Sequence, residues 1–191
     1  MAKTPSQMTP LDTVAPDFTL PNLDGQEISL YKEVGQNPFL VLFICNHCPY
    51  VIHVMPGLLK ISEKLLAKGF KIFAINSNDV SHYPEDSPSK MKEFSDQWQM
   101  PFPYLFDESQ NTAKQYRAAC TPDLFLFNGS KKLFYRGQLD ESRPGNAQPN
   151  DSHNLREAAD AILQKALPPT DQKPSMGCNI KWKKGLEPNY W

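Results

Sequence analysis

The sequence predicts an α/β fold in which one open sheet is covered by helices on both faces. Residues 39–44 and 71–75 are nearly all apolar, which is typical of strands buried on both faces. Segments with apolar residues at helical spacing alternate with these strands. Strands and helices that alternate along one chain favour a layered α/β sheet.

The first half of the chain predicts a hairpin, then a strand, a helix and a second strand. In order, these are expected at residues 17–20 with 27–30, 39–44, 49–68 and 71–75. The turn sequence of residues 22–25 lies between two short β-prone segments, as in a β-hairpin. Pro49 suits the first position of a helix, and Pro56 inside the helical pattern predicts a kink.

The second half predicts shorter elements and a closing helix. We expect a polar loop at residues 76–89, followed by a helix at 90–99 and a strand at 103–106. A helix at residues 112–119, two strands at 123–127 and 132–135, and a helix at 154–166 complete the series. Residues 1–15 are polar and contain prolines, which predicts an arm that is flexible or draped over the domain. We therefore expect one domain over residues 1–167, followed by a Pro/Lys-rich tail over residues 168–191.

The composition argues against several classes of partner and against a disulfide scaffold. Twenty basic and twenty-one acidic residues give no general attraction to nucleic acid or to a membrane surface. The first residues lack the apolar segment of a signal peptide, and no apolar run approaches the roughly 18–20 residues that cross a bilayer. Four cysteines are few for a chain of 191 residues. We expect a cytoplasmic protein, in which two close cysteines indicate catalysis or metal binding.

Cys45 and Cys48 stand where the first buried strand gives way to the long helix. Backbone N–H groups and the helix dipole favour negative charge at such a junction. A thiol there can fall from a pKa of about 8.5 into the range of roughly 3.5–7.5 and become a nucleophilic thiolate. The cationic form of His47, next to Cys48, would lower that pKa further. The sequence thus predicts a thiol-redox protein.

Several segments resemble the thioredoxin-fold redoxin superfamily of the alkyl hydroperoxide reductase/thiol-specific antioxidant type. Residues 15–20 and 24–25 resemble the opening of the superfamily, and residues 135–137, 143–145 and 177–182 resemble a peroxiredoxin-like group within it. The same peroxiredoxin-like group carries the motif that residues 46–51, Asn-His-Cys-Pro-Tyr-Val, resemble, and it is the group to which the chain is most similar. The resemblance implies a thioredoxin-like fold, with a central mixed sheet, helices on both faces and an N-terminal β-hairpin. It implies no organic cofactor.

Two alignments with this superfamily both select Cys48 as the nucleophile. Against thioredoxin, Val51 takes the place of the resolving cysteine and Leu42 that of the buried aspartate. Against peroxiredoxins, Cys45 takes the place of a threonine, and we find no counterpart of the peroxiredoxin arginine. The thiol that pairs with Cys48 therefore stays open.

The resemblance also implies the remaining site residues. Thr121 and Pro122 resemble the cis-proline loop, which faces the nucleophile and whose residue before proline pairs with the substrate backbone. Cys45 is expected either to resolve the Cys48 intermediate or to pack in the core. Cys120, beside that loop, and Cys178, in the tail, are alternative resolving cysteines.

A metal site is a further alternative for the first cysteine pair. Cys45, His47, Cys48 and His53 are all donors that zinc accepts. A second paired cluster is missing from the sequence, so we expect no metal.

The expected function is thiol–disulfide exchange by Cys48 on a disulfide-bearing protein, with an external thiol reductant such as a thioredoxin. The alternative is a thiol peroxidase that reduces peroxides through a Cys48 sulfenic acid. A third hypothesis is a non-catalytic binding module that keeps the fold. Nucleic acid and membrane are not expected as partners.

Overall fold

A five-stranded mixed sheet forms the centre of the computed structural model, which describes residues 3–190. Its strands are β4 (Phe39–Phe43), β5 (Lys71–Asn76), β6 (Tyr104–Phe106), β8 (Asp123–Phe127) and β9 (Leu133–Gly137). They lie in the order β6-β5-β4-β8-β9, with β4, β5 and β6 parallel and β8 and β9 antiparallel. The predicted mixed sheet is confirmed.

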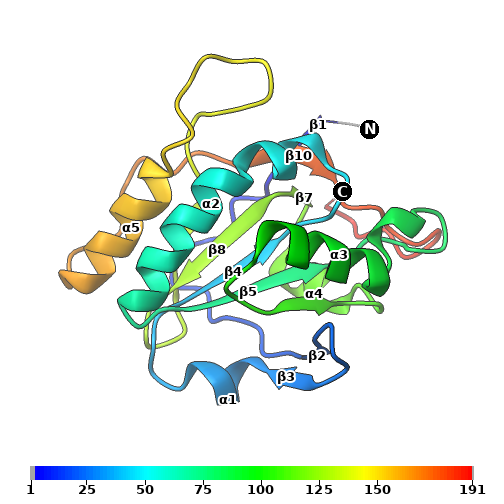
Figure 1. Ribbon diagram of the computed structural model, residues 1–191. Coiled ribbons are helices and arrows are strands. Elements are labelled where there is room, and N and C mark those ends of the chain that lie inside the picture. The colour runs from blue at the N-terminus through cyan, green and yellow to red at the C-terminus, as the bar shows by residue number, and fades with distance from the viewer. Residues whose placement is uncertain (1–2, 191) are drawn as a thin grey trace.

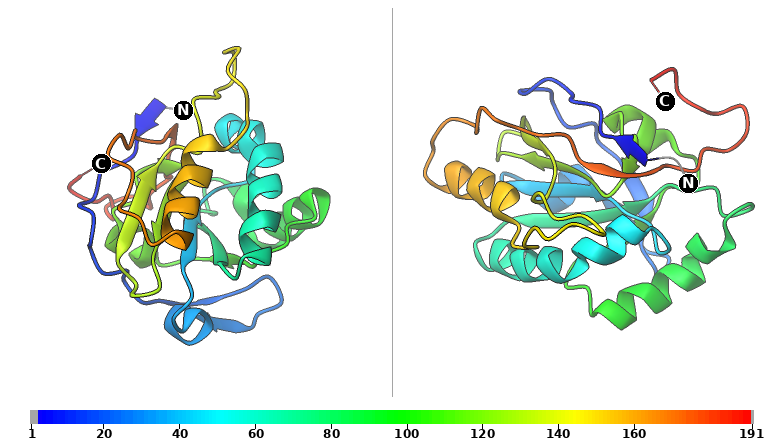
Figure 2. Two further views of the ribbon diagram at one scale, coloured as in Figure 1. Left: turned by 90° about the vertical axis from the view of Figure 1, so that its left-hand side faces the viewer. Right: turned by 90° about the horizontal axis from the view of Figure 1, so that it is seen from above.

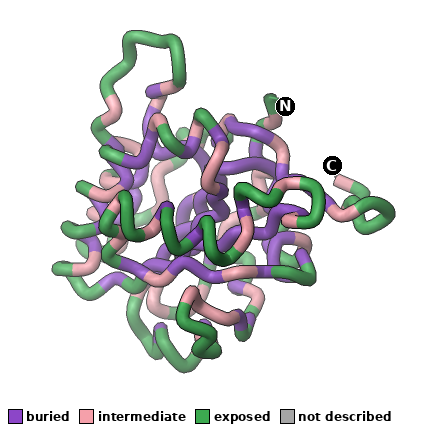
Figure 3. The backbone as a smooth tube through the Cα atoms, turned by 45° about the vertical axis from the view of Figure 1, so that its right-hand side comes forward, coloured by how far each residue is buried: buried purple, intermediate pink, exposed green. Residues whose placement is uncertain are grey.

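Helices cover both faces of this sheet, as predicted (Figure 1). They are α1 (Leu30–Val34), α2 (Pro49–Ala67), α3 (Pro88–Trp98), α4 (Asn111–Tyr116) and α5 (His153–Leu163). Side chains of β4 alternate between the faces, so Leu40 and Leu42 pack with α2, α3 and α5. Phe39, Val41 and Phe43 pack on the other face with α1 and α4. One apolar cluster therefore packs on each face of β4. Figure 3 shows buried backbone through the middle of the molecule.

The N-terminal hairpin is confirmed as strands β2 (Thr19–Pro21) and β3 (Glu27–Ser29). The turn between them uses Gly25 at φ 78°, which lies in the left-handed region that glycine adopts readily.

A second, small sheet joins parts of the chain that the sequence left unstructured. Strands β1 (Lys3–Pro5), β10 (Met176–Asn179) and β7 (Cys120–Thr121) lie side by side and antiparallel, with β10 in the middle. Figure 2 shows the N-terminal and C-terminal segments running close together over the sheet. The tail therefore packs on the domain, while a domain boundary at residue 167 stays a prediction.

Several element boundaries differ from those predicted. Helix α3 begins at Pro88, because proline suits the first turn, and the preceding loop contains a 3₁₀ turn, η1 (Pro84–Asp86). Helix α4 ends at Tyr116 because Arg117 takes a left-handed conformation, with φ 55°. Helix α1 was not predicted, since five residues carry too little periodicity. Within residues 3–190, none of the helices combines the length and apolarity that crossing a membrane requires.

Candidate active site: a cysteine cluster at the start of helix α2

Cys48 is the N-cap residue of helix α2. It has extended backbone dihedrals, φ −75° and ψ 121°, and Pro49 follows in the first helical turn. The carbonyl of Cys48 accepts the Ile52 N–H at 3.0 Å, so the helix begins directly after the thiol. Although it lies at a helix end, Cys48 is fully buried.

The surroundings of Cys48 lower its thiol pKa to about 5. The largest cause is a hydrogen bond from the Cys45 thiol; the Cys178 thiol and the backbone N–H of Val51 add further ones, and burial opposes them. In its thiol form, Cys48 lies 3.2 Å from the Thr121 carbonyl oxygen, which accepts the hydrogen bond. At neutral pH the thiolate predominates.

Cys45 follows the end of β4 and supports the thiolate as a donor. Its Sγ lies 3.3 Å from the Thr121 hydroxyl oxygen. Hydrogen bonding to Cys48, burial and the charge of Asp86 together raise the pKa of Cys45 well above its ordinary value. Cys45 therefore keeps its proton while Cys48 carries the charge.

Cys178 reaches the same place from the C-terminal tail. It lies in β10 directly opposite Thr121 in the strand register. Burial, followed by the neighbouring Cys48 thiolate, raises the pKa of Cys178 to about 12. The neighbouring Cys45 and Cys48 thus meet Cys178, from the far end of the sequence, at the start of α2.

The bond between Thr121 and Pro122 is cis, as the resemblance implies. Thr121 contacts both Cys45 and Cys48, so this loop faces the nucleophile. Cys120 takes a different direction: its Sγ lies 3.5 Å from the Pro122 carbonyl oxygen, and burial raises its pKa well above the ordinary value. The described hydrogen bonds do not connect Cys120 with Cys48, because neighbouring side chains of a strand point to opposite faces.

His47 forms an ion pair with a residue that the sequence did not suggest. Its Nδ1 lies 3.0 Å from Oδ2 of Asp86, and its ring stacks on Tyr83 with a centroid distance of 6.0 Å. The close contact with the Asp86 carboxylate is the largest cause that raises the pKa of His47, and the Cys48 thiolate also contributes. Since this electrostatic interaction is mutual, protonated His47 also stabilises the thiolate.

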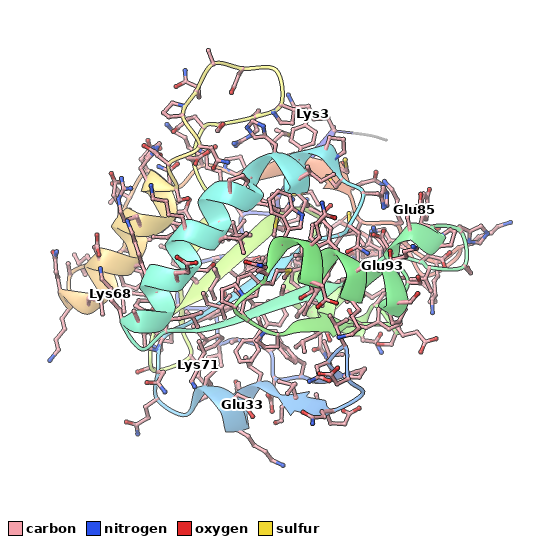
Figure 4. The ribbon with its side chains drawn as sticks, viewed as in Figure 1. Lys3, Glu33, Lys68, Lys71, Glu85 and Glu93 are labelled. Atoms are coloured by element: carbon pink, nitrogen blue, oxygen red, sulfur yellow. The ribbon has the colours of Figure 1, made fainter. Side chains whose placement is uncertain are left out.

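Asp86 organises the loop that carries the nucleophile. It is completely buried and accepts the Asn46 N–H at 2.8 Å and the Asn78 side-chain amide at 2.7 Å. The sequence did contain one sign of this polar network. Residues 76–79 are polar and directly follow a buried strand, and such residues gather at the end of a sheet. In Figure 4, Lys3 and Glu85 lie to either side of the start of α2.

The structure brings together only some of the residues that the sequence suggested as zinc ligands. Cys45, His47 and Asp86 place one donor atom each within 4.8 Å of one another. His53 is separate, because its Nε2 lies 2.7 Å from the Ser142 hydroxyl. Zinc binding at Cys45 would have to displace the proton that the surroundings hold on this thiol. The cluster therefore fits thiol chemistry better than a zinc ion.

Comparison with known proteins identifies relatives of the whole chain and of its thioredoxin-like part. The model of the AhpC/TSA family matches residues 11–136. The crystal structure of an uncharacterized conserved protein from Geobacillus kaustophilus is 46% identical, with a TM-score of 0.94 over 97% of this chain and 98% of that one. The thioredoxin domain of a thiol-disulfide oxidoreductase from Bacteroides vulgatus is 18% identical, with a TM-score of 0.60 over 78% of this chain and 96% of that one, and confirms the thioredoxin-like fold.

A curated relative carries an activity in its name. The thiol-disulfide oxidoreductase ResA from Bacillus anthracis is 26% identical over 119 residues, which are 62% of this chain. The match spans 64% of the length of that relative.

Proposed function

The chain belongs to the AhpC/TSA family, and on that premise we propose that it is a thiol–disulfide oxidoreductase with Cys48 as the attacking thiolate. One observation carries the proposal: Cys48, with a pKa of about 5, receives a hydrogen bond from a protonated Cys45 and lies against the Thr121-Pro122 loop. The name of the ResA relative supports the same chemistry.

The reaction follows from the properties of a low-pKa thiol. The Cys48 thiolate attacks one sulfur of a disulfide, a new S–S bond forms, and the other sulfur leaves as a thiolate that takes a proton from water. The Cys45 thiol and the helix N–H groups stabilise the charge on Cys48 before the attack and whenever Cys48 leaves again. A low pKa also makes Cys48 a good leaving group, so the mixed disulfide exchanges further.

The proposal includes the partners of this reaction. The substrate is a disulfide-bearing protein, and an external thiol such as a thioredoxin returns the site to its reduced form. A cytoplasmic location stays a prediction that rests on the small number of cysteines.

A thiol peroxidase is the second candidate, favoured by the complete burial of Cys48, which a small peroxide can approach more easily than a protein. Peroxidases need a cation to polarise the O–O bond. Arg143, which lines a hollow together with Pro122, instead donates its guanidinium to Gln138 and to the carbonyls of Asp140 and Ser142. Disulfide exchange is therefore the better supported function, ahead of both the peroxidase and the binding module.

The test is turnover of insulin disulfides in the presence of dithiothreitol, compared with peroxide consumption under the same conditions. We expect insulin reduction to exceed peroxide turnover. Cys48→Ser should abolish it, and Cys120→Ser should retain it, because the Cys120 thiol points away from the nucleophile. Full insulin reduction by Cys48→Ser would refute the mechanism. Faster peroxide turnover would favour the peroxidase.

A further inference from the structure

Strand β10 lies across the nucleophile. Cys48 and Thr121 are buried, at 0% and 3% exposed, and Cys178 of β10 is opposite Thr121 in the register. Helix α2, whose N-cap residue is Cys48, also packs against β10. A disulfide of another protein can therefore reach Cys48 only after β10 has moved away from Thr121.

The backbone of β10 lies very close to the backbone of the cis-proline loop at Gly177. A Cβ atom added at Gly177 would overlap the Thr121 carbonyl oxygen, and it would lie 2.6 Å from the Thr121 carbonyl carbon and 3.2 Å from the Pro122 nitrogen. Only a residue without a side chain allows the strand to lie this close. Gly177 thus places the next residue, Cys178, beside Cys48.

β10 is anchored at its two ends and along the edge that pairs with β1, while its edge toward Thr121 carries the shorter ladder. Before it, Ser175 exchanges hydrogen bonds with Ser6, at 2.9 Å in both directions. After it, the backbone N–H of Lys181 donates to Asn78 at 2.8 Å, and Ile180 and Trp182 are buried in the apolar cluster that contains α1 and α4. Between these anchors the ladder with β7 joins only two residue pairs, against three with β1, so β10 can separate from Thr121 together with β1 while the tail stays attached.

We propose that β10 is an internal substrate strand, which occupies the Thr121 edge that an outside disulfide must use and whose Cys178 resolves the mixed disulfide on Cys48. The inference rests on the proposed function and adds to it the resolving thiol and the element that controls access. Cys45 stays in the site as the hydrogen-bond donor.

The two steps balance in atoms and electrons. With β10 open, the Cys48 thiolate attacks the outside disulfide, whose first sulfur leaves as a thiolate and is protonated by water. Cys178 then gives up its proton and attacks Sγ of Cys48; a Cys48–Cys178 bond forms, and the second outside sulfur leaves with that proton. Two electrons pass from the two cysteines to the outside disulfide.

The electrostatics of Cys178 suit this order of events. At rest, the Cys48 thiolate is one of the causes that keep the pKa of Cys178 high. Once Cys48 is part of a mixed disulfide it carries no charge, so this contribution disappears at the step in which Cys178 must lose its proton.

The experiment uses the fully reduced chain and one equivalent of oxidised glutathione without oxygen. The readouts are the reduced glutathione released and non-reducing peptide mapping by mass spectrometry. We expect two glutathiones from the wild type, with a Cys48–Cys178 bridge. Cys178→Ser should release one and keep the other on Cys48, while the matched control Cys120→Ser should behave as the wild type.

Gly177→Ala tests whether β10 restricts access to Cys48. Because it pushes β10 away from Thr121 and enlarges the fraction of open molecules, the first glutathione should leave about tenfold faster or more. Far-ultraviolet circular dichroism establishes that this variant is folded, and Cys178→Ser, which keeps the size of the side chain, provides an independent test.

Two results would overturn the inference while leaving the proposed function intact. One is a Cys45–Cys48 bridge in the wild type together with release of two glutathiones by Cys178→Ser. The other is an unchanged first release from a folded Gly177→Ala. If neither the wild type nor Gly177→Ala releases any glutathione, the proposed function itself fails.

Discussion

Replacing Cys45 by alanine should raise the pKa of Cys48, because the Cys45 thiol is the largest cause that lowers it. A hydrogen bond to a charged group contributes about 1.5–3 kcal/mol. At 1.36 kcal/mol per pKa unit, loss of this bond corresponds to a rise of about 1–2 units. The pKa of Cys48 should therefore move from about 5 to roughly 6–7.

The assay is a pH titration of the thiolate absorbance in the ultraviolet. Cys48 titrates alone in the acidic range, because burial and neighbouring charge raise the pKa values of Cys120 and Cys178. Cys120→Ala is the matched control, since it also removes a buried thiol but leaves the Cys48 titration in place. An unchanged or lower midpoint in Cys45→Ala would refute the assignment of Cys45 as the main donor.

Three further predictions concern the loop, the core and metal binding. Asp86→Asn should lower the pKa of His47, which proton NMR measures. Since folding raises that pKa, the pair contributes its full stabilisation below about pH 6.5 and loses it at higher pH. In urea titrations the substitution should therefore lower the free energy of unfolding more at about pH 5.5 than at about pH 8. An equal loss at both pH values would contradict the pairing. Leu42→Ala should cost about 2–5 kcal/mol of unfolding free energy, because Leu42 is fully buried in the sheet; a loss below about 1 kcal/mol would show that the site collapses around the cavity. Metal analysis of the purified chain should find far less than one zinc per molecule, because zinc would have to displace the proton held on Cys45, and stoichiometric zinc would contradict the redox assignment.

The parts of the fold that could be predicted are those with strong local signals. Strand β4 is an unbroken apolar run, and helix α2 begins at Pro49, where proline is compatible with the first turn. The nucleophile was predictable for the same reason, because Cys48 is adjacent to that proline. The cis bond before Pro122 was predicted only through the resemblance, since the sequence around a proline does not determine its isomer.

The parts that could not be predicted depend on pairing between distant residues. β10 has four residues and its partner β7 has two, so neither carries a periodic pattern. Their register joins Cys178 to Thr121 across more than fifty residues, and only the folded chain shows it. The ion pair of His47 with Asp86 has the same origin, because the sequence shows a histidine and an aspartate far apart and gives no reason to pair these two.

The meeting of both chain ends has a practical consequence for anyone who labels or immobilises this protein. Strand β1 lies against β10, and the Tyr190 hydroxyl donates to main-chain carbonyls around α4. A tag on either end would therefore pull on segments that are connected to the strand above Cys48. The exposed loop of residues 144–149, drawn at the top of Figure 1, is the better attachment point for a dye or a surface. A probe at Ala147 would leave both terminal segments free to follow the opening of β10.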